Sequence, residues 1–431
     1  MRRRVGNYLK AGRARAGGLF VVAAACLAFA GCRAAQEALS VKPKSLRDVP
    51  AARLAFRFEP DAAEETLPEL LRKDEAEEPL APVKADFETR RGNAEALMRT
   101  VVSPTGQRAL ALYGTSETDT DFRIDLYGSA GNFVRNVLPH DLTGVFPEQV
   151  EWSPDGSRIA FSGIRTPSAQ ATPTPADTPD PADAATQAGD PSVVLTPTPV
   201  APIIPPVQTF NSEQIYVGNS DGNDLRPLTN KEGLIYFKLS WSPDGQSIAA
   251  LACRVDEWES RKAQGKAPAG RPRVVTLEGQ ERLLDDRLTD VAPAWSPDGS
   301  KVATAFDFDV AVYDAGGSAP TAAALPLAEP LRAASKDYDA RLFKKDASKN
   351  EQTGAANKAG GDAGQVASAT PAPADDVLIS FNPVVRLEWL EPETLFAQTA
   401  FVRYFQNEPV PVISYKRWHV LRLSPQAALL E

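Results

Sequence analysis

The pentapeptide Trp-Ser-Pro-Asp-Gly occurs three times in this sequence, and its recurrence constrains the fold more than any other feature. The copies begin at Trp152, Trp241 and Trp295, and each leads into an apolar, strand-like run. Weaker copies lie at 102–111, which lacks the tryptophan, and at 388–397, which lacks the glycine. Such recurrence indicates a repeat architecture, in which neighbouring units bury a core that none could bury alone.

The pentapeptide has the chemistry of a tight turn. Proline presets φ at about −65° for the second turn position. The serine and the aspartate can hydrogen-bond to nearby backbone amides, and the glycine supplies the positive φ that closes a short hairpin loop. The turn residues of the three full copies are Pro154, Asp155, Gly156, Pro243, Asp244, Gly245, Pro297, Asp298 and Gly299.

The tryptophan of each copy ends the incoming strand, so we expect Trp152, Trp241, Trp295 and the matching Trp389 to pack in the core and not to bind a ligand. A second pair of strands with its own turn follows each hairpin, as in Gln214–Gly222 and Asp224–Thr229. One unit therefore has four antiparallel strands, which is typical of a propeller blade.

The predicted fold is an all-β propeller of five to six four-stranded antiparallel blades over 97–424. We expect the strand at 54–58 to close it by pairing with the last strand, Ile413–Leu423, because an open propeller would leave strand edges unpaired. A degraded sixth blade between Pro320 and Pro383 is left open. The Pro-rich stretch 165–208 and the low-complexity stretch 345–376 are predicted to be disordered insertions.

These repeats resemble the TolB-like β-propellers, a family with WD40-like Trp-Ser-Pro-Asp-Gly repeats, over about residues 98 to 424. The resemblance implies the propeller fold. TolB itself is a periplasmic protein of cell-envelope maintenance, and it carries an amino-terminal α/β domain. The stretch between Cys32 and the first repeat is too short for that domain, so the resemblance does not extend to the TolB role.

The amino terminus has the pattern of an export signal. A basic leader is followed by the uncharged apolar stretch Gly18–Gly31, which is too short to span a membrane, so residues 1–31 are predicted to be a signal peptide. Phe29-Ala30-Gly31-Cys32 resembles a bacterial lipobox, although Phe29 stands where leucine is usual. We predict lipidation of Cys32, with ordinary cleavage near Ala30 as the alternative. Residues 32–96 are expected to be a tether.

The same resemblance to lipoproteins gives a location. Because Arg33 and not aspartate follows the cysteine, the protein is expected to be exported, lipid-anchored and held at the periplasmic face of the outer membrane. The formal charge of −9 argues against nonspecific nucleic-acid binding, which needs many phosphate contacts. We expect a monomer that contacts the membrane only through its lipid.

Few residues are suited to metal or acid–base chemistry. The chain has two histidines and three cysteines, which leaves little material for a His/Cys zinc site or a disulfide framework. His140 is expected to be exposed in a loop, His419 to lie on the sheet surface, and Cys253 to be a buried small hydrophobe. We predict no catalytic residue, no cofactor and no metal site, although Asp307 and Asp309 leave a carboxylate-only metal site open.

The insertions 165–208 and 256–271 follow the second strand of their blades, and 345–376 follows the blade of Trp295. Second connections and connections between blades share one end, so we expect all three insertions at the blade end opposite the pentapeptide turns. Trp258 and Arg261, in the insertion 256–271, are residue types common at binding hot spots and are the predicted partner anchors. The leading hypothesis is a non-catalytic scaffold that binds an envelope protein or polymer. The alternatives are a propeller-channel enzyme, such as a metal-dependent hydrolase or lyase, and a purely structural lipoprotein. No Gly-x-Ser-x-Gly nucleophile elbow is present.

Overall fold

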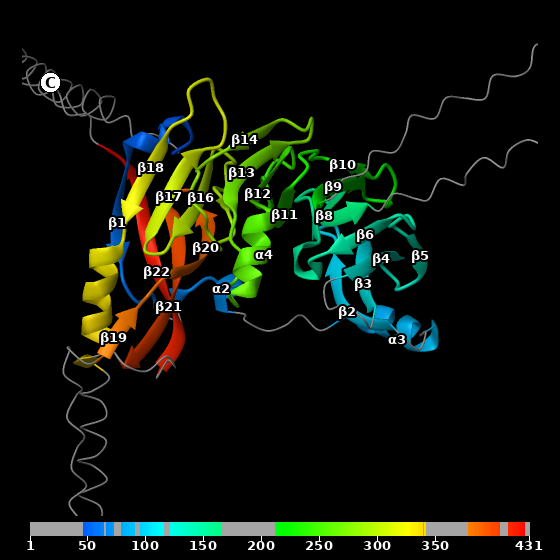
Figure 1. Cartoon of the computed structure of the whole chain (residues 1–431), viewed down its shortest axis with the longest axis horizontal. Coiled ribbons are helices and arrows are strands. Elements are labelled where there is room, and N and C mark those ends of the chain that lie inside the picture. The colour runs from blue at the N-terminus through cyan, green and yellow to red at the C-terminus, as the bar shows by residue number, and fades with distance from the viewer. Residues whose placement is uncertain are drawn as a thin grey trace, which may run out of the picture. The chain divides into compact units, whose positions relative to one another are not determined.

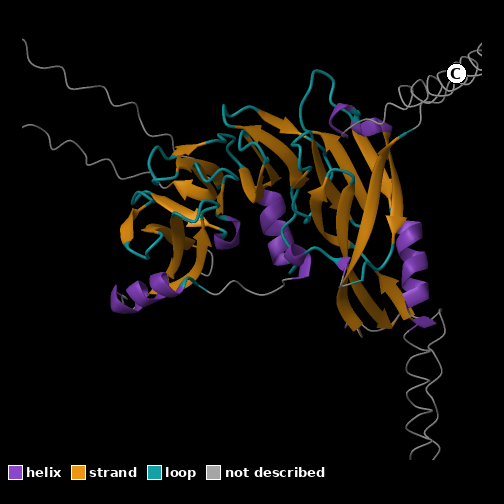
Figure 2. Ribbon diagram, turned by 180° about the vertical axis from the view of Figure 1, so that it is seen from behind, coloured by secondary structure: helices purple, strands orange, loops and turns teal. Residues whose placement is uncertain are grey.

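The computed structural model describes residues 46–63, 66–72, 79–90, 95–115, 121–165, 212–338, 340–341, 378–405 and 413–426. The chain divides into two compact units, Met1–Asp48 and Val49–Glu431. Of the first unit, only the 3-10 turn η1 (Leu46–Asp48) is described. The second unit is mostly β, with a few short helices (Figure 2). No helix among the described residues has the length and apolar character needed to cross a membrane.

Two four-stranded antiparallel sheets follow one another in the middle of the chain (Figure 1). Sheet II, as we call it, has the order β11-β12-β13-β14, and sheet III has the order β15-β16-β17-β18. Their strands are β11 (Leu234–Trp241), β12 (Ser247–Arg254), β13 (Arg271–Thr276), β14 (Glu281–Leu283), β15 (Ala294–Trp295), β16 (Lys301–Phe306), β17 (Asp309–Asp314) and β18 (Ala322–Pro326).

Sheet I precedes them and has nine strands in the order β10-β9-β8-β6-β4-β3-β2, with β5 on β4 and β7 on β8. It consists of two antiparallel groups, β2–β5 and β6–β10, joined where Phe122 of β4 meets Gly144 of β6. The strands are β2 (Glu95–Val102), β3 (Arg108–Thr115), β4 (Asp121–Gly128), β5 (Phe133–Asn136), β6 (Leu142–Val145), β7 (Glu151–Trp152), β8 (Arg158–Arg165), β9 (Gln214–Asn219) and β10 (Arg226–Pro227). The 3-10 turn η4 (Pro147–Gln149) lies between β6 and β7.

Sheet IV brings the two ends of the second unit together. Its strands are β1 (Leu54–Glu59), β19 (Leu378–Phe381), β20 (Val384–Glu391), β21 (Thr394–Phe405) and β22 (Ile413–Pro425). β19 and β20 share one edge of β21, and β22 lies between β21 and β1. β1 pairs with β22 from Leu54 opposite Pro425 to Glu59 opposite Val420, which is the pairing expected for 54–58.

The segment expected to be a tether contains packed elements where the structure describes it. It contains η2 (Ala51–Arg53), β1, α2 (Glu69–Arg72) and α3 (Ala81–Arg90). Leu67 and Leu71 are buried in a cluster on sheet IV, and Val83 and Phe87 are buried in a cluster on sheet I. The strand was expected from the alternation of 54–58, but the burial of Leu67, Leu71, Val83 and Phe87 was not, because the side chains that cover them come from distant parts of the chain.

The three pentapeptide turns have the same internal hydrogen bonds. Each serine hydroxyl donates to the aspartate of its turn, over 2.6, 2.6 and 2.7 Å in chain order. The same carboxylate accepts the backbone N–H two residues further on, at 3.0 Å in each turn. The glycines Gly156, Gly245 and Gly299 have φ of 69°, 65° and 70°. This is the geometry that the turn chemistry of the sequence predicts.

The four tryptophans of the repeats are buried, with 5 to 8% of their surface exposed. The indole N–H of Trp152 donates to the carbonyl of Val101 at 3.0 Å, and that of Trp295 donates to the carbonyl of Ser240 at 3.0 Å. Each of these bonds links one strand group to the group before it. The tryptophans therefore belong to the core, as expected, and Trp152 and Trp295 also join successive groups.

The fold is thus mostly β and antiparallel, as the sequence predicts. No sheet closes on itself within the described strands. The number of blades stays a prediction.

Candidate functional site

The second connection of each sheet is where the repeats differ. In sheet II, β12 and β13 are joined through helix α4 (Val255–Ala263), whereas in sheet III only Asp307 and Phe308 lie between β16 and β17. Because successive strands are antiparallel, this connection leaves from the sheet end opposite the pentapeptide turn. In sheet I the same connection holds 166–211, outside the described residues.

Helix α4, labelled in Figure 1, is attached to its sheet by an ion pair. The guanidinium of Arg271, on β13, donates to both carboxylate oxygens of Glu257 at 2.8 and 2.9 Å. Glu257 also accepts the backbone N–H of Arg254 at 3.0 Å, which caps the first turn of α4. The hydrogen bonds from Arg271 lower the pKa of Glu257 to about 2. The helix is therefore held rigidly, as a binding surface requires.

Trp258, one of the two predicted anchors, packs its indole against two phenylalanines. Its ring centroid lies 5.3 Å from that of Phe146 and 5.3 Å from that of Phe237. Phe146 has a left-handed backbone, with φ of 63°, at the entry to η4. Such a conformation is strained for a bulky residue and persists only where the surroundings hold it. The aromatic cluster is thus built from three chain segments that are far apart in sequence.

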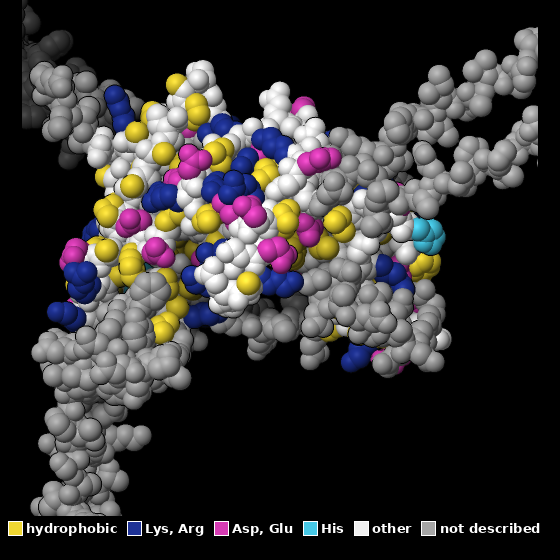
Figure 3. Space-filling model, viewed as in Figure 1, with side chains coloured by type: hydrophobic (Ala, Val, Ile, Leu, Met, Phe, Trp, Pro, Cys, Tyr) yellow, Lys and Arg dark blue, Asp and Glu magenta, His cyan; other side chains and the backbone are white. Residues whose placement is uncertain are grey.

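A cavity of about 470 Å³ opens beside this cluster. Its apolar wall consists of Val145, Phe146, Ile164, Trp258 and Pro268, and its charged wall consists of Glu213, Glu259, Lys262 and Lys266. Figure 3 shows acidic and basic side chains intermingled on the face that carries α4. An apolar floor with charges of both signs around it suits a polypeptide side chain or a polymer unit better than a highly charged ligand.

The second predicted anchor, Arg261, has a structural role. Its Nε donates to the carbonyl of Ala267 at 2.8 Å, which closes the loop that follows α4. Arg261 does not line the cavity, whereas Trp258 does. The structure therefore does not bring the two anchors together in one site.

An acidic residue that the sequence analysis missed, Glu151, lies on β7 at the contact between sheets I and II. Glu151 of β7 accepts the backbone N–H of Trp241, and burial raises its pKa to about 7, against the opposing charge of Arg99. Glu388 of β20, which raises that pKa further, stands at the matching place directly before a repeat tryptophan. That shared position was the signal that could have singled out both glutamates.

His419 corrects one expectation. It is 1% exposed and not on the sheet surface, because the chain around Asp61 covers this part of β22. Its Nδ1 accepts the backbone N–H of Asp61 at 3.2 Å, and its Nε2 lies 2.9 Å from the hydroxyl of Thr399. Burial lowers its pKa to about 3, so the ring is neutral near pH 7. His419 therefore serves the packing of sheet IV.

The remaining candidates are as follows. His140 is exposed at the end of a turn, as expected (Figure 3). Cys253 is fully buried among apolar side chains, and burial raises the pKa of its thiol to about 12, which suits a small hydrophobe.

Among the described residues, which include Asp307 and Asp309, no group of three or more His, Cys, Asp or Glu could hold a metal ion. Cys32 and the leader lie outside the described residues.

Comparisons with known proteins give only distant likenesses. No protein-family model matches the chain, and no curated protein matches it in sequence. Among solved structures, a prolyl endopeptidase is 10% identical with a TM-score of 0.35 over 74% of this chain. This chain spans 34% of that enzyme's length. A putative TolB from Agrobacterium tumefaciens is 12% identical, with a TM-score of 0.32, over 77% of this chain and 90% of the other.

An oligogalacturonate lyase in complex with manganese is 11% identical, with a TM-score of 0.24, over 77% of this chain and 78% of the other. Likenesses this distant assign neither an activity nor a partner.

Proposed function

We propose that this protein is an exported, lipid-anchored β-propeller that binds an envelope protein or polymer and performs no chemistry of its own. The strands of sheets I to IV form five four-stranded groups, counting β6 with β7 and β19 with β20 as single interrupted strands. In this proposal the five groups are five blades, and β1 closes the last one. The partner binds at the blade ends that carry the second connections, and the lipid on Cys32 confines the protein to the membrane surface.

One observation carries the binding role. The connection between the second and third strands has two residues in sheet III. In sheet II the same connection contains α4, and Trp258 and Phe146 line a cavity of about 470 Å³ beside it. A packed helix with an ion pair holding it adds nothing that sheet II needs in order to form, since sheet III forms without one. Loops on a rigid scaffold are the usual carriers of binding residues.

Site-directed photo-cross-linking in intact cells tests this role. A photoreactive residue at Glu259, exposed on α4, is expected to give an adduct of defined mass, and the substitution Trp258→Ala is expected to abolish it. The matched control places the same residue at Gln246, exposed in the pentapeptide turn at the opposite end of sheet II. Equal adducts at both positions, or an adduct that survives Trp258→Ala, would contradict a partner at α4.

The anchor has a separate test. Cys32→Ser is expected to abolish metabolic labelling with a fatty acid and to move the protein from the membrane to the soluble fraction, because several acyl chains supply the stable attachment. Absence of labelling in the wild-type protein would favour ordinary cleavage near Ala30, and labelling that persists in Cys32→Ser would contradict an anchor on Cys32. Fractionation of inner and outer membranes then checks the proposed outer-membrane location.

The alternative is an enzyme whose site includes Glu151 of β7, and a single observation favours it. Glu151 has a pKa of about 7, which is suited to general acid–base chemistry near neutral pH. Against this role, its carboxyl group already accepts the Trp241 backbone N–H, so it acts as a structural link between sheets I and II. Under the binding proposal, Glu151→Gln leaves the Glu259 adduct unchanged.

A further inference from the structure

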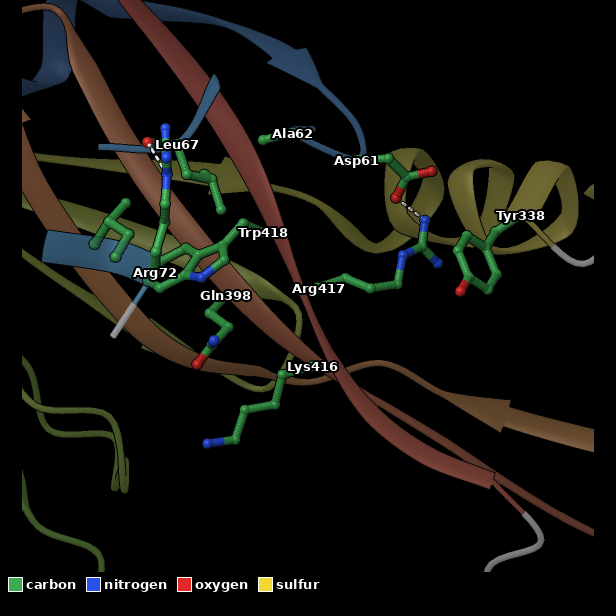
Figure 4. Close-up of a pocket in the computed structure, with 10 residues that line it drawn as sticks. Asp61, Ala62, Leu67, Arg72, Tyr338, Gln398, Lys416, Arg417 and Trp418 are labelled. Atoms are coloured by element: carbon green, nitrogen blue, oxygen red, sulfur yellow. Dashed lines mark hydrogen bonds and ion pairs between the residues drawn. The ribbon is translucent and has the colours of Figure 1, made fainter. Parts of the chain in front are cut away.

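A second cavity, of about 450 Å³, lies on sheet IV beside α2, far from α4 in the chain and independent of the proposed function (Figure 4). Its apolar wall is made by Trp418 of β22 together with Leu67 and Leu71, whose side chains pack in the same cluster as the indole. In Figure 4 the side chains of Trp418 and Leu67 lie on one side of β22, whereas Arg417 points to the other side.

The polar side of this cavity holds Gln398 and Lys416. Gln398 stands opposite Trp418 in the pairing of β21 with β22, so both side chains are on one face of the sheet. Gln398 is only 4% exposed, yet its amide has no hydrogen-bond partner among the described residues. Figure 4 shows the amide directed into the space between Trp418 and Lys416. The amide atoms reach solvent in the cavity and can therefore hydrogen-bond with a ligand there.

The charge around the cavity is positive. Lys416 lines it on the Gln398 side, and Arg72 lines it on the Leu67 side, where its Nε donates to the carbonyl of Leu67 at 2.8 Å (Figure 4). The acidic residue of the lining, Asp61, is already ion-paired with Arg417 and Arg341. Beside Gln398, Arg386 is paired with Glu388 at 2.8 Å. The lining therefore presents an excess of cations in a chain whose formal charge is −9.

We propose that this cavity binds a carboxylate attached to an apolar group, of the size and kind found in an N-acylated amino acid, either free or as the carboxyl terminus of a polypeptide. The carboxylate accepts from the Gln398 amide and the Lys416 ammonium, and the apolar group lies against Trp418, Leu67 and Leu71. Charge-assisted bonds of this kind are the stronger class of hydrogen bond, and each contributes about 1.5 kcal/mol or more, or about tenfold in affinity.

The test uses the full chain and isothermal titration calorimetry with N-acetyl-L-leucine. The acid is expected to bind, and N-acetyl-L-leucinamide, which lacks the charge, is expected to bind at least about tenfold more weakly. A six-residue peptide ending in leucine distinguishes the sources: tighter binding than the free acid indicates a polypeptide terminus, and equal or weaker binding indicates a free small molecule.

Substitutions locate the site. Lys416→Met is expected to weaken binding about tenfold and Gln398→Met somewhat less, whereas Lys416→Arg retains it. Lys84→Met, on the exposed side of α3, is the matched control and leaves binding unchanged. Equal binding of acid and amide, no binding of acid or peptide, or equal effects of Lys416→Met and Lys84→Met would overturn the proposal. The thermal midpoint of each variant shows whether it remains folded.

Discussion

Sheets II and III are built on the same turn, yet they differ in what each attaches to it. In both, the pentapeptide joins the first two strands, the four strands have the same order, and the turn contains the same serine–aspartate bond. Sheet II then carries α4 between its second and third strands, while sheet III turns through two residues. The comparison teaches that the repeated turn specifies the four-stranded sheet, whereas the segments inserted between its strands, such as α4, differ from one sheet to the next.

Sheet III has its own departure, directly after the turn. Lys301 stands where sheet II has Ser247, and its side chain is 2% exposed. Its Nζ lies 3.1 Å from Asp314, whose carboxylate also accepts the backbone N–H groups of Ala51 and Thr321. This pair therefore joins the amino-terminal segment to sheet III, a link that sheet II lacks at the matching place.

The largest expected effect on stability comes from replacing Lys301 of sheet III by serine, the residue at the matching position of sheet II. Lys301→Ser is expected to lower the free energy of unfolding by about 3 kcal/mol or more, because it leaves the Asp314 carboxylate without its cation in a buried site. Urea denaturation measures the change. The matched control, Ser247→Ala in sheet II, is expected to change it by less than about 0.5 kcal/mol. Similar effects at the two positions would contradict the difference between the sheets.

The next prediction concerns the ion pair that holds α4 on sheet II. Glu257→Gln is expected to lower the free energy of unfolding by about 2 kcal/mol at pH 7, since the Glu257 pKa lies at about 2 in the fold against an ordinary value of 4.5. A lowered pKa stabilises the fold above pH 4.5, and this stabilisation is lost as the pH falls from 4.5 toward 2. The wild-type protein should therefore converge on the variant in acid. Glu259→Gln, exposed on the same helix, is the control and should show no such convergence.

The junction between sheets I and II gives a smaller effect of opposite sign. Glu151 has a pKa raised from 4.5 to about 7, so its contribution to stability is complete below pH 4.5 and is lost as the pH rises through 7. Glu151→Gln keeps an acceptor for the Trp241 N–H and removes the ionisation. It is expected to stabilise the protein by about 1 to 2 kcal/mol at pH 8 and by much less at pH 4.5, measured by thermal unfolding. The exposed control Glu232→Gln should show neither change.

The smallest effect tests what the two sheets share. Gly245→Ala and Gly299→Ala are each expected to destabilise the protein by about 1 kcal/mol, because an alanine at positive φ is strained. An added Cβ meets nothing closer than 3.7 Å at either glycine, so the backbone alone sets the effect. Gly316→Ala, where φ is not positive and space is open, is the control. Unequal losses at the two turns would mean that the turns are not equivalent.

Much of the fold could be predicted because its determinants are local. The turn residues act within five positions of one another, and the alternation of Leu54–Phe58 is visible in a single short strand. The partners of Trp258 could not be predicted, since Phe146 comes from sheet I and Phe237 from the far side of β12 in the chain. The cavity beside α2 was missed for the same reason, because Leu67, Gln398 and Lys416 come from opposite ends of the chain.

The sequence by itself determined the repeated hairpin, the burial of its tryptophans and the mostly β character of the chain, since short-range turn chemistry and strand alternation encode these features. Only the tertiary structure decided that His419 is buried and neutral, that residues 51–90 pack on the sheets where described, and that Trp258 faces a cavity while Arg261 does not. These features depend on which distant segments meet, and a desolvated environment that shifts a pKa exists only once those segments are in contact.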